Sequence, residues 1–196
     1  MDETRPAARM EVQQESLRVL AEASRVSPQS TALKVYQALE FEHLGDSLLA
    51  QGKLGPARGA YLNAIGPAEQ MKRLGDTSAL LFYIASNERL AEIEIRSGRR
   101  EEALRYAQAG LHGMPQAALT VAQRLIVPRT CAAMGRTYAK LAQSDLRAPS
   151  DREQAVRWLK QSLAAWQSVQ EEPAFGSPHR REMQAVSDLL ASLSRG

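Results

Sequence analysis

The chain has 196 residues, enough for one domain or one short repeat array with a sizeable hydrophobic core. Aromatic residues make up only 5%, and the abundance of Ala, Leu, Arg, Glu and Gln favours helix over sheet. The 25 basic and 22 acidic residues are interspersed, so no basic stripe predicts a nucleic-acid partner. No apolar run approaches the roughly 18 residues of a membrane span, and the acidic start lacks the apolar core of a signal peptide. We therefore expect a cytoplasmic protein without membrane insertion.

Apolar residues recur at helical spacing in the first half of the chain. Ser30 or Thr31 is placed to cap the second helix, and Gly52 to end it in the left-handed conformation. Pro56 falls in the first turn of the third helix, where its missing N–H is harmless, and Gly66-Pro67 predicts a bend. The expected helices run over residues 8–25, 31–49 and 54–74.

The second half continues the helical pattern. Thr77 and Asp151 are expected helix caps, Pro128 is an expected kink, and residues 144–150 and 171–178 are expected loops. No window alternates apolar and polar residues as a strand does, so we predict an all-α fold. The expected helices run from Thr77 to Ser97, over 100–112, from Pro115 to Gln143, from 151 to about 170 and over 179–195.

One short sequence pattern occurs three times along the chain. A large apolar residue precedes a tiny one, and an alanine follows on a second amphipathic segment. A repeated unit that cannot bury its own apolar face predicts stacked helical hairpins. The small residues expected where helices cross closely are Gly45 with Ala57, Ala91 with Ala103, and Gly135 with Ala155.

These residues resemble the tetratricopeptide repeat (TPR) family. The first repeat matches its pattern at Phe41, Leu44, Gly45, Leu48, Ala57, Tyr61 and Ala64. The second matches at Asn87, Leu90, Ala91, Ala103, Ala107 and Gly110, and the third at Cys131, Met134, Gly135, Tyr138, Ala155, Leu159 and Ser162. The spacing between the equivalent alanines of successive repeats exceeds the length of the basic repeat, about 34 residues, so we expect lengthened hairpins.

The resemblance implies a right-handed α-α superhelix of about three helical hairpins, with a leading and a capping helix. The expected organisation is a disordered start, a TPR-like array, a loop, and a capping helix that carries Met183, Val186, Leu190 and Leu193 inward. The corresponding residues are 1–7, 8–170, 171–178 and 179–196.

The segment from Asp151 to Leu163, with Trp166, is similar to the last repeat of arrays attached to bacterial serine/threonine protein kinases. The chain itself contains no Gly-rich loop, His-Arg-Asp or Asp-Phe-Gly motif. Two functions therefore stay open. The first is a non-catalytic scaffold for a peptide or protein partner, and the second is a sensor or regulatory segment of a larger bacterial signalling protein.

The resemblance places charged side chains of the first helices on a concave partner-binding groove. Acidic pairs at i and i+4 in the first two hairpins would attract basic groups, and basic residues would hold an acidic or C-terminal carboxylate group. The alternative is a solvated helix face with ordinary intrahelical pairs. The candidate groove residues are Glu42, Asp46, Glu88, Arg89, Glu92, Arg96, Arg136 and Lys140.

The histidines, the cysteine and the tryptophans are the remaining candidates for a metal site, a nucleophile or a docking surface. His43, His112 and His179 have no second ligand at helical spacing, so we expect surface roles and no metal site. Cys131, the only cysteine, is expected as a small buried residue rather than a nucleophile. Trp158 and Trp166 are expected on one helical face, either packed under the last helix or exposed as a docking site. We expect no enzymatic activity and no cofactor, and the oligomeric state stays open.

Overall fold

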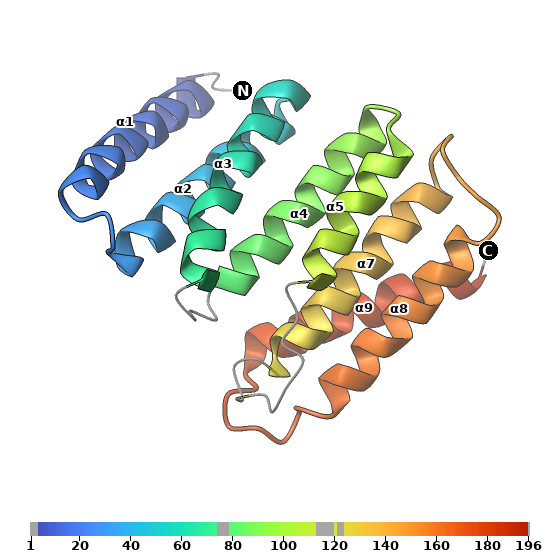
Figure 1. Ribbon diagram of the computed structural model, residues 1–196. Helices are drawn as coiled ribbons and strands as arrows, with labels where there is room; N and C mark the ends of the chain where they lie inside the picture. The colour runs from blue at the N-terminus through green and yellow to red at the C-terminus, as the bar shows by residue number, and fades with distance from the viewer. Residues whose placement is uncertain (1–3, 74–78, 113–119, 121–123, 196) are drawn as a thin grey trace. The chain divides into compact units, whose positions relative to one another are not determined.

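The computed structural model describes residues 4–73, 79–112, 120 and 124–195 (Figure 1). All regular structure in these ranges is helical, which confirms the all-α class. The chain divides into two compact units, Met1–Leu90 and Ala91–Gly196, and the division falls within α4. The helices are α1 (Thr4–Val26), α2 (Thr31–Ala50), α3 (Leu54–Arg73), α4 (Ala79–Arg96), α5 (Arg100–His112), α7 (Ile126–Ala142), α8 (Asp151–Gln167) and α9 (Ser177–Arg195).

The first unit contains a helical hairpin of α2 and α3, and α1 lies along α2 (Figure 1). The Ser30 side chain caps α2 by accepting a hydrogen bond from the Leu33 N–H at 3.4 Å, as predicted. Gly52 turns the chain between the two helices with a φ of 73°, a conformation that costs glycine little. Local sequence signals therefore set both ends of α2.

Small residues bring α2 and α3 close together. A Cβ atom added to Gly45 would lie 2.7 Å from the Tyr61 ring, far inside van der Waals contact. Tyr61 is almost completely buried, and Ala57 is fully buried on the same helix. The predicted close crossing at Gly45 is confirmed, and it depends on the absence of a side chain there.

The second unit repeats this device in the hairpin of α7 and α8. A Cβ atom on Gly135 would lie 2.7 Å from the Leu159 side chain, and Ala155 and Leu159 are fully buried. The predicted small residues Ala91 and Ala103 are also fully buried, in a cluster that joins α4, α5 and α7.

Helix α9 covers the last hairpin of the second unit, as predicted. Val186 and Leu193 are buried in one cluster with Ala155 and Leu159, and Leu190 packs against it. Met183 packs on a second cluster around the fully buried Trp166. The apolar face of α9 therefore stabilises the hairpin by removing its outer surface from water.

Four expectations about local structure need correction or comment. Helix α1 begins at Thr4, so residues 4–7, expected to be disordered, are helical. Helix α3 runs through Pro67 to Arg73, close to the end expected for it, and the fully buried Ala68 and Met71 anchor its last turns in a cluster with residues of α2 and α4. The Asp151 side chain does not cap α8: Ser150 occupies the N-cap position, and the carboxylate accepts from the Ala148 N–H. Of the helix expected from Pro115 to Gln143, the structure has α7 from Ile126 to Ala142, and most of residues 115–125 lie outside the described residues.

The two tryptophans lie in different environments, because residues eight positions apart on an α-helix diverge by about 80°. Trp166 is fully buried beside Phe175, with ring centroids 5.9 Å apart, so it packs under the last helix and offers no docking surface. Trp158 instead packs, partly buried, on the cluster of Ala103 and Met134. In the described part of the chain, no helix has the length and apolar character that crossing a membrane requires.

Candidate functional site

The candidate groove residues fall into both units, so each group is described by itself. In the first unit, Asp46 of α2 lies half-exposed at the hairpin crossing. The Tyr61 hydroxyl donates a hydrogen bond to its Oδ1 at 2.6 Å, and Arg89 Nε of α4 lies 3.3 Å from the same oxygen. The Asp46–Arg89 pair is therefore half-exposed, and its carboxylate is anchored to the hairpin by the buried Tyr61.

Glu42 lies one turn before Asp46 on α2 and is half-buried. Its Oε1 accepts a hydrogen bond from the Ser86 hydroxyl of α4 at 2.9 Å. Burial raises the pKa of Glu42 to about 7; the Ser86 hydrogen bond opposes the shift, and the nearby Asp46 charge adds to it. Glu42 therefore carries only a partial negative charge at neutral pH, which reduces its capacity to attract a basic group.

In the second unit, Glu92 of α4 joins two cations of the candidate groove. Arg96 donates to Glu92 Oε1 at 2.6 Å within α4, and Lys140 of α7 donates to Oε2 at 2.6 Å. The Glu92 side chain is only 10% exposed, whereas those of Arg96 and Lys140 are 50% and 37% exposed. The carboxylate is thus occupied on both oxygens, and its effect is to hold two cations from two hairpins at the surface.

The remaining two candidates, Glu88 and Arg136, are half-buried on α4 and α7. The structure therefore brings together Glu42, Asp46 and Arg89 in one unit, and Glu92, Arg96 and Lys140 in the other. Sequence reasoning assigned Glu92 to the partner-facing acidic set. Its burial makes it instead a support for the cations beside it.

A second buried charge has a structural role that the sequence pattern did not reveal. Asp151 is fully buried, and both of its oxygens accept from Arg100, at 2.6 and 2.7 Å. Arg100 also donates to the Leu146 carbonyl at 2.8 Å, so it fixes the loop before α8. The hydrogen bonds from Arg100 hold the pKa of Asp151 below its usual range despite its burial. No local spacing signals a pair so distant in sequence.

The other candidate groups show no chemistry of a site. Burial raises the pKa of the Cys131 thiol, which disfavours the reactive thiolate. His43 and His112 are exposed. His179, expected at the surface, is half-buried and stacks on Phe175 at a ring distance of 5.7 Å. Within the described residues, no three His, Cys, Asp or Glu side chains are grouped so that they could hold a metal ion.

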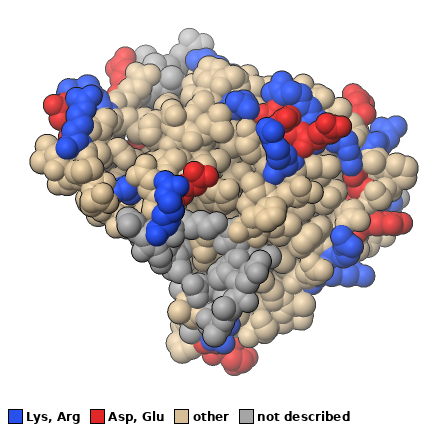
Figure 2. Space-filling view, viewed as in Figure 1, with Lys and Arg blue, Asp and Glu red and all other residues tan. Residues whose placement is uncertain are grey.

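Charge is dispersed over the face of the molecule shown in Figure 2. Blue and red side chains lie in small mixed groups among uncharged ones, and no large area carries a single sign. This pattern is consistent with short ion pairs such as Arg96–Glu92 and Arg89–Asp46. Comparison with protein-family models, with curated proteins and with solved structures finds no significant match.

Proposed function

We propose that this chain is a non-catalytic, TPR-like interaction protein that binds a peptide or protein partner along the first helices of its hairpins. Support for the repeat comes from the matched close approaches of Gly45 to Tyr61 and of Gly135 to Leu159. In each pair a glycine on one helix meets a large side chain on the next. The right-handed superhelical stacking of these hairpins is part of the proposal.

The observation that carries the binding function is the pair of cations on Glu92. Arg96 and Lys140 come from different helices, converge on one buried carboxylate, and stay 50% and 37% exposed, and each cation has more N–H donors than the one that binds Glu92. Their positions are set before any partner arrives, so binding loses little side-chain entropy. A carboxylate or other acidic group of a partner is the complementary ligand, and we expect such pairing to affect association rate and specificity most.

Selection from a displayed library of random peptides, with both free and blocked C-termini, tests this function. We expect enrichment of peptides with acidic residues. Their binding should be lost in the triple variant Glu92→Gln, Arg96→Gln and Lys140→Gln, which removes the cations without leaving a buried charge unpaired. Exposed Lys53→Gln, with the same change of net charge, is the matched control.

Two results would count against the proposal. If no peptide is enriched over several rounds, the chain is not a peptide-binding scaffold of this kind. If selected peptides bind the triple variant as tightly as the native chain, while circular dichroism shows an intact helical fold, the Glu92 cluster is only a solvated ion-pair network.

A further inference from the structure

Helix α1 exposes a stripe of valines. Val12, Val19 and Val26 are 69%, 54% and 83% exposed, although valine is usually buried. They recur every seven residues, so they lie within an arc of about 40° on the helix. The glutamates of the same helix border this stripe on one side, whereas Ser16 and Leu20 are half-buried on the other. These glutamates are Glu11, Glu15 and Glu22.

The acidic border has a consistent local order. Glu15 accepts hydrogen bonds from Arg18 at 2.6 and 2.9 Å, so its side chain is held along the helix surface. Arg18 lies on the same side of the valines as the three glutamates, about 20–60° further around the helix. A shallow hollow on this face is lined by two glutamates and by apolar or small side chains, with no cation among its lining residues. The exposed face of α1 is therefore apolar and acidic.

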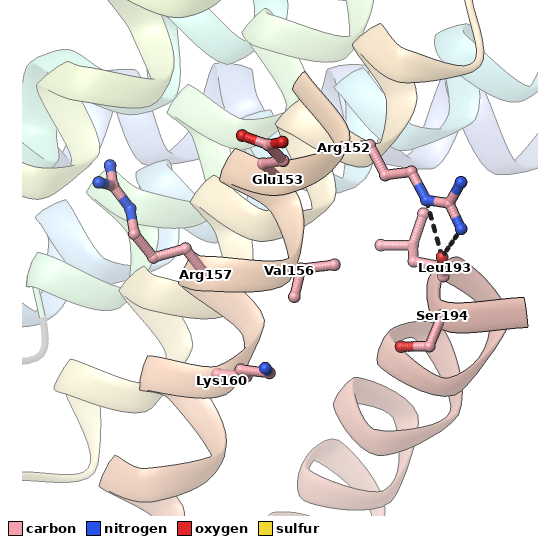
Figure 3. Close-up of a pocket in the computed structure, with 7 residues that line it drawn as sticks. All are labelled: Arg152, Glu153, Val156, Arg157, Lys160, Leu193 and Ser194. Carbon is pink, nitrogen blue, oxygen red and sulfur yellow. Dashed lines mark hydrogen bonds between the residues drawn. The ribbon is translucent and has the colours of Figure 1, made fainter. Parts of the chain in front are cut away.

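A groove between α8 and α9 has the opposite character (Figure 3). Val156 and Leu193 give it an apolar floor, and its volume is about 480 Å³. Arg152 reaches across the groove and donates to the Leu193 carbonyl at 2.9 Å, which fixes α9 against α8. Lys160 extends from α8 on the same side as Val156.

Positive charge dominates this groove. Arg152, Arg157 and Lys160 line it, against the single acidic side chain of Glu153. Arg157 lies on the flank of α8 away from α9, where it donates to Gln154 at 2.5 Å. Lys160 is exposed and makes no ion pair with any residue that the structure describes. The groove therefore suits an apolar side chain flanked by carboxylates.

We infer that α1 of one copy of this chain docks in the α8/α9 groove of a second copy. Two properties match. Valines meet Val156 and Leu193, and glutamates meet Arg157 and Lys160. The stretch from Val12 to Val19 spans about 10 Å and that from Arg152 to Lys160 about 12 Å, so the two surfaces also agree in length.

The contact joins two different surfaces, so each copy offers one of each. The area of one helix face is small, and such interfaces give weak, reversible association. Self-association should therefore depend on protein concentration and weaken as salt screens the charged border. This inference does not depend on the proposed binding of a partner at Glu92.

Sedimentation velocity over a range of protein concentrations tests the contact with the full chain. We expect reversible self-association that falls by about tenfold or more in the variant Arg157→Glu/Lys160→Glu. The variant Lys53→Glu/Arg181→Glu changes net charge equally at exposed positions and should behave as the native chain does. Val12→Ser/Val19→Ser should also weaken association without lowering the melting midpoint, because both side chains are exposed.

A charge swap gives the decisive arm. A chain with Glu11, Glu15 and Glu22 all changed to lysine should not self-associate, but mixing it with Arg157→Glu/Lys160→Glu should restore association. A monomer at every accessible concentration would overturn the inference. So would association that the groove variant leaves unchanged, or a failure of the mixture when circular dichroism shows both variants folded, because the copies would then meet elsewhere or not at all.

Discussion

Replacing Gly45 with alanine tests the close approach on which the first hairpin depends. The new Cβ atom would lie 2.7 Å from two atoms of the Tyr61 ring and 2.9 Å from a third. Ordinary contact begins near 3.5 Å, so the ring and α3 must move away by about 1 Å. Because the Tyr61 hydroxyl also donates to Asp46 at 2.6 Å, that movement strains a hydrogen bond to a charged acceptor.

The expected magnitude follows from three effects. Alanine is favoured over glycine inside a helix by about 0.5–1 kcal/mol. Overpacking a dense crossing costs about 1–3 kcal/mol, and weakening the Tyr61–Asp46 bond costs about 1 kcal/mol more, since Asp46 is half-exposed. The net loss in the free energy of unfolding is about 1–3 kcal/mol, which lowers the melting midpoint by about 2–10 °C.

The matched control is Gly59→Ala in α3. A Cβ atom there meets nothing within 4 Å, so the same substitution should raise the midpoint through helix propensity alone. Thermal and urea unfolding followed by circular dichroism measure both variants. Comparing Gly45→Ala in the native and Tyr61→Phe backgrounds separates the ring clash from the lost hydrogen bond. If Gly45→Ala stabilises the chain as much as Gly59→Ala does, the α2–α3 crossing is not as close as the structure places it.

Three further predictions concern stability. Burial raises the pKa of Glu42 from 4.5 to about 7, so folding favours its protonated form and this group lowers the stability of the fold as pH rises from about 4.5 to 7. In urea unfolding, Glu42→Gln should therefore gain about 1–3 kcal/mol at pH 8 and little at pH 4.5. Equal gains at both pH values would refute the burial argument. Arg100→Leu leaves Asp151 buried without its partner and should lose about 3 kcal/mol, whereas Arg100→Lys should lose less; similar midpoints for Arg100→Leu and the native chain would show the pair to be dispensable. Ending the chain after Glu172 removes α9 from Leu159 and Trp166, so the truncated chain should bind a hydrophobic dye and scatter light. A truncated chain that stays monomeric and equally stable would refute the capping role of α9.

Most of the helical framework could be predicted because its signals are local. Ser30 caps α2, Gly52 and Gly98 adopt positive φ after their helices, and the bounds of α5 agree with those expected. The recurrence of tiny residues at one place in each hairpin located the crossings, since only those positions tolerate helix axes that close. Helical periodicity and turn chemistry determine these features without knowledge of distant contacts.

The candidate site was harder to predict because its properties arise from contacts between helices. Glu42 and Glu92 cannot be told apart by sequence pattern, because each belongs to an acidic pair at i and i+4: Glu42 with Asp46, and Glu92 with Glu88. In the structure the half-buried Glu42 accepts a hydrogen bond from Ser86, whereas Glu92 accepts hydrogen bonds from Arg96 and Lys140. Helical spacing gives the face of a residue but not the depth of its carboxylate or the cation that a neighbouring helix supplies.

The buried carboxylates show how depth separates two functions of the same residue type. Asp151 receives both arms of the Arg100 guanidinium and a backbone N–H, so the pair is inward and serves the loop before α8. Glu92 is nearly as deep, but its two cations, Arg96 and Lys140, have side chains that are 50% and 37% exposed. In a purely structural ion pair the hydrogen-bonding groups of both partners are used within the protein, whereas a binding surface needs exposed donors that are still available. The cations at Glu92 are exposed enough to meet that condition, and the Arg100 guanidinium at Asp151 is used to fix a loop. This difference is the physical reason to look for a partner at Arg96 and Lys140.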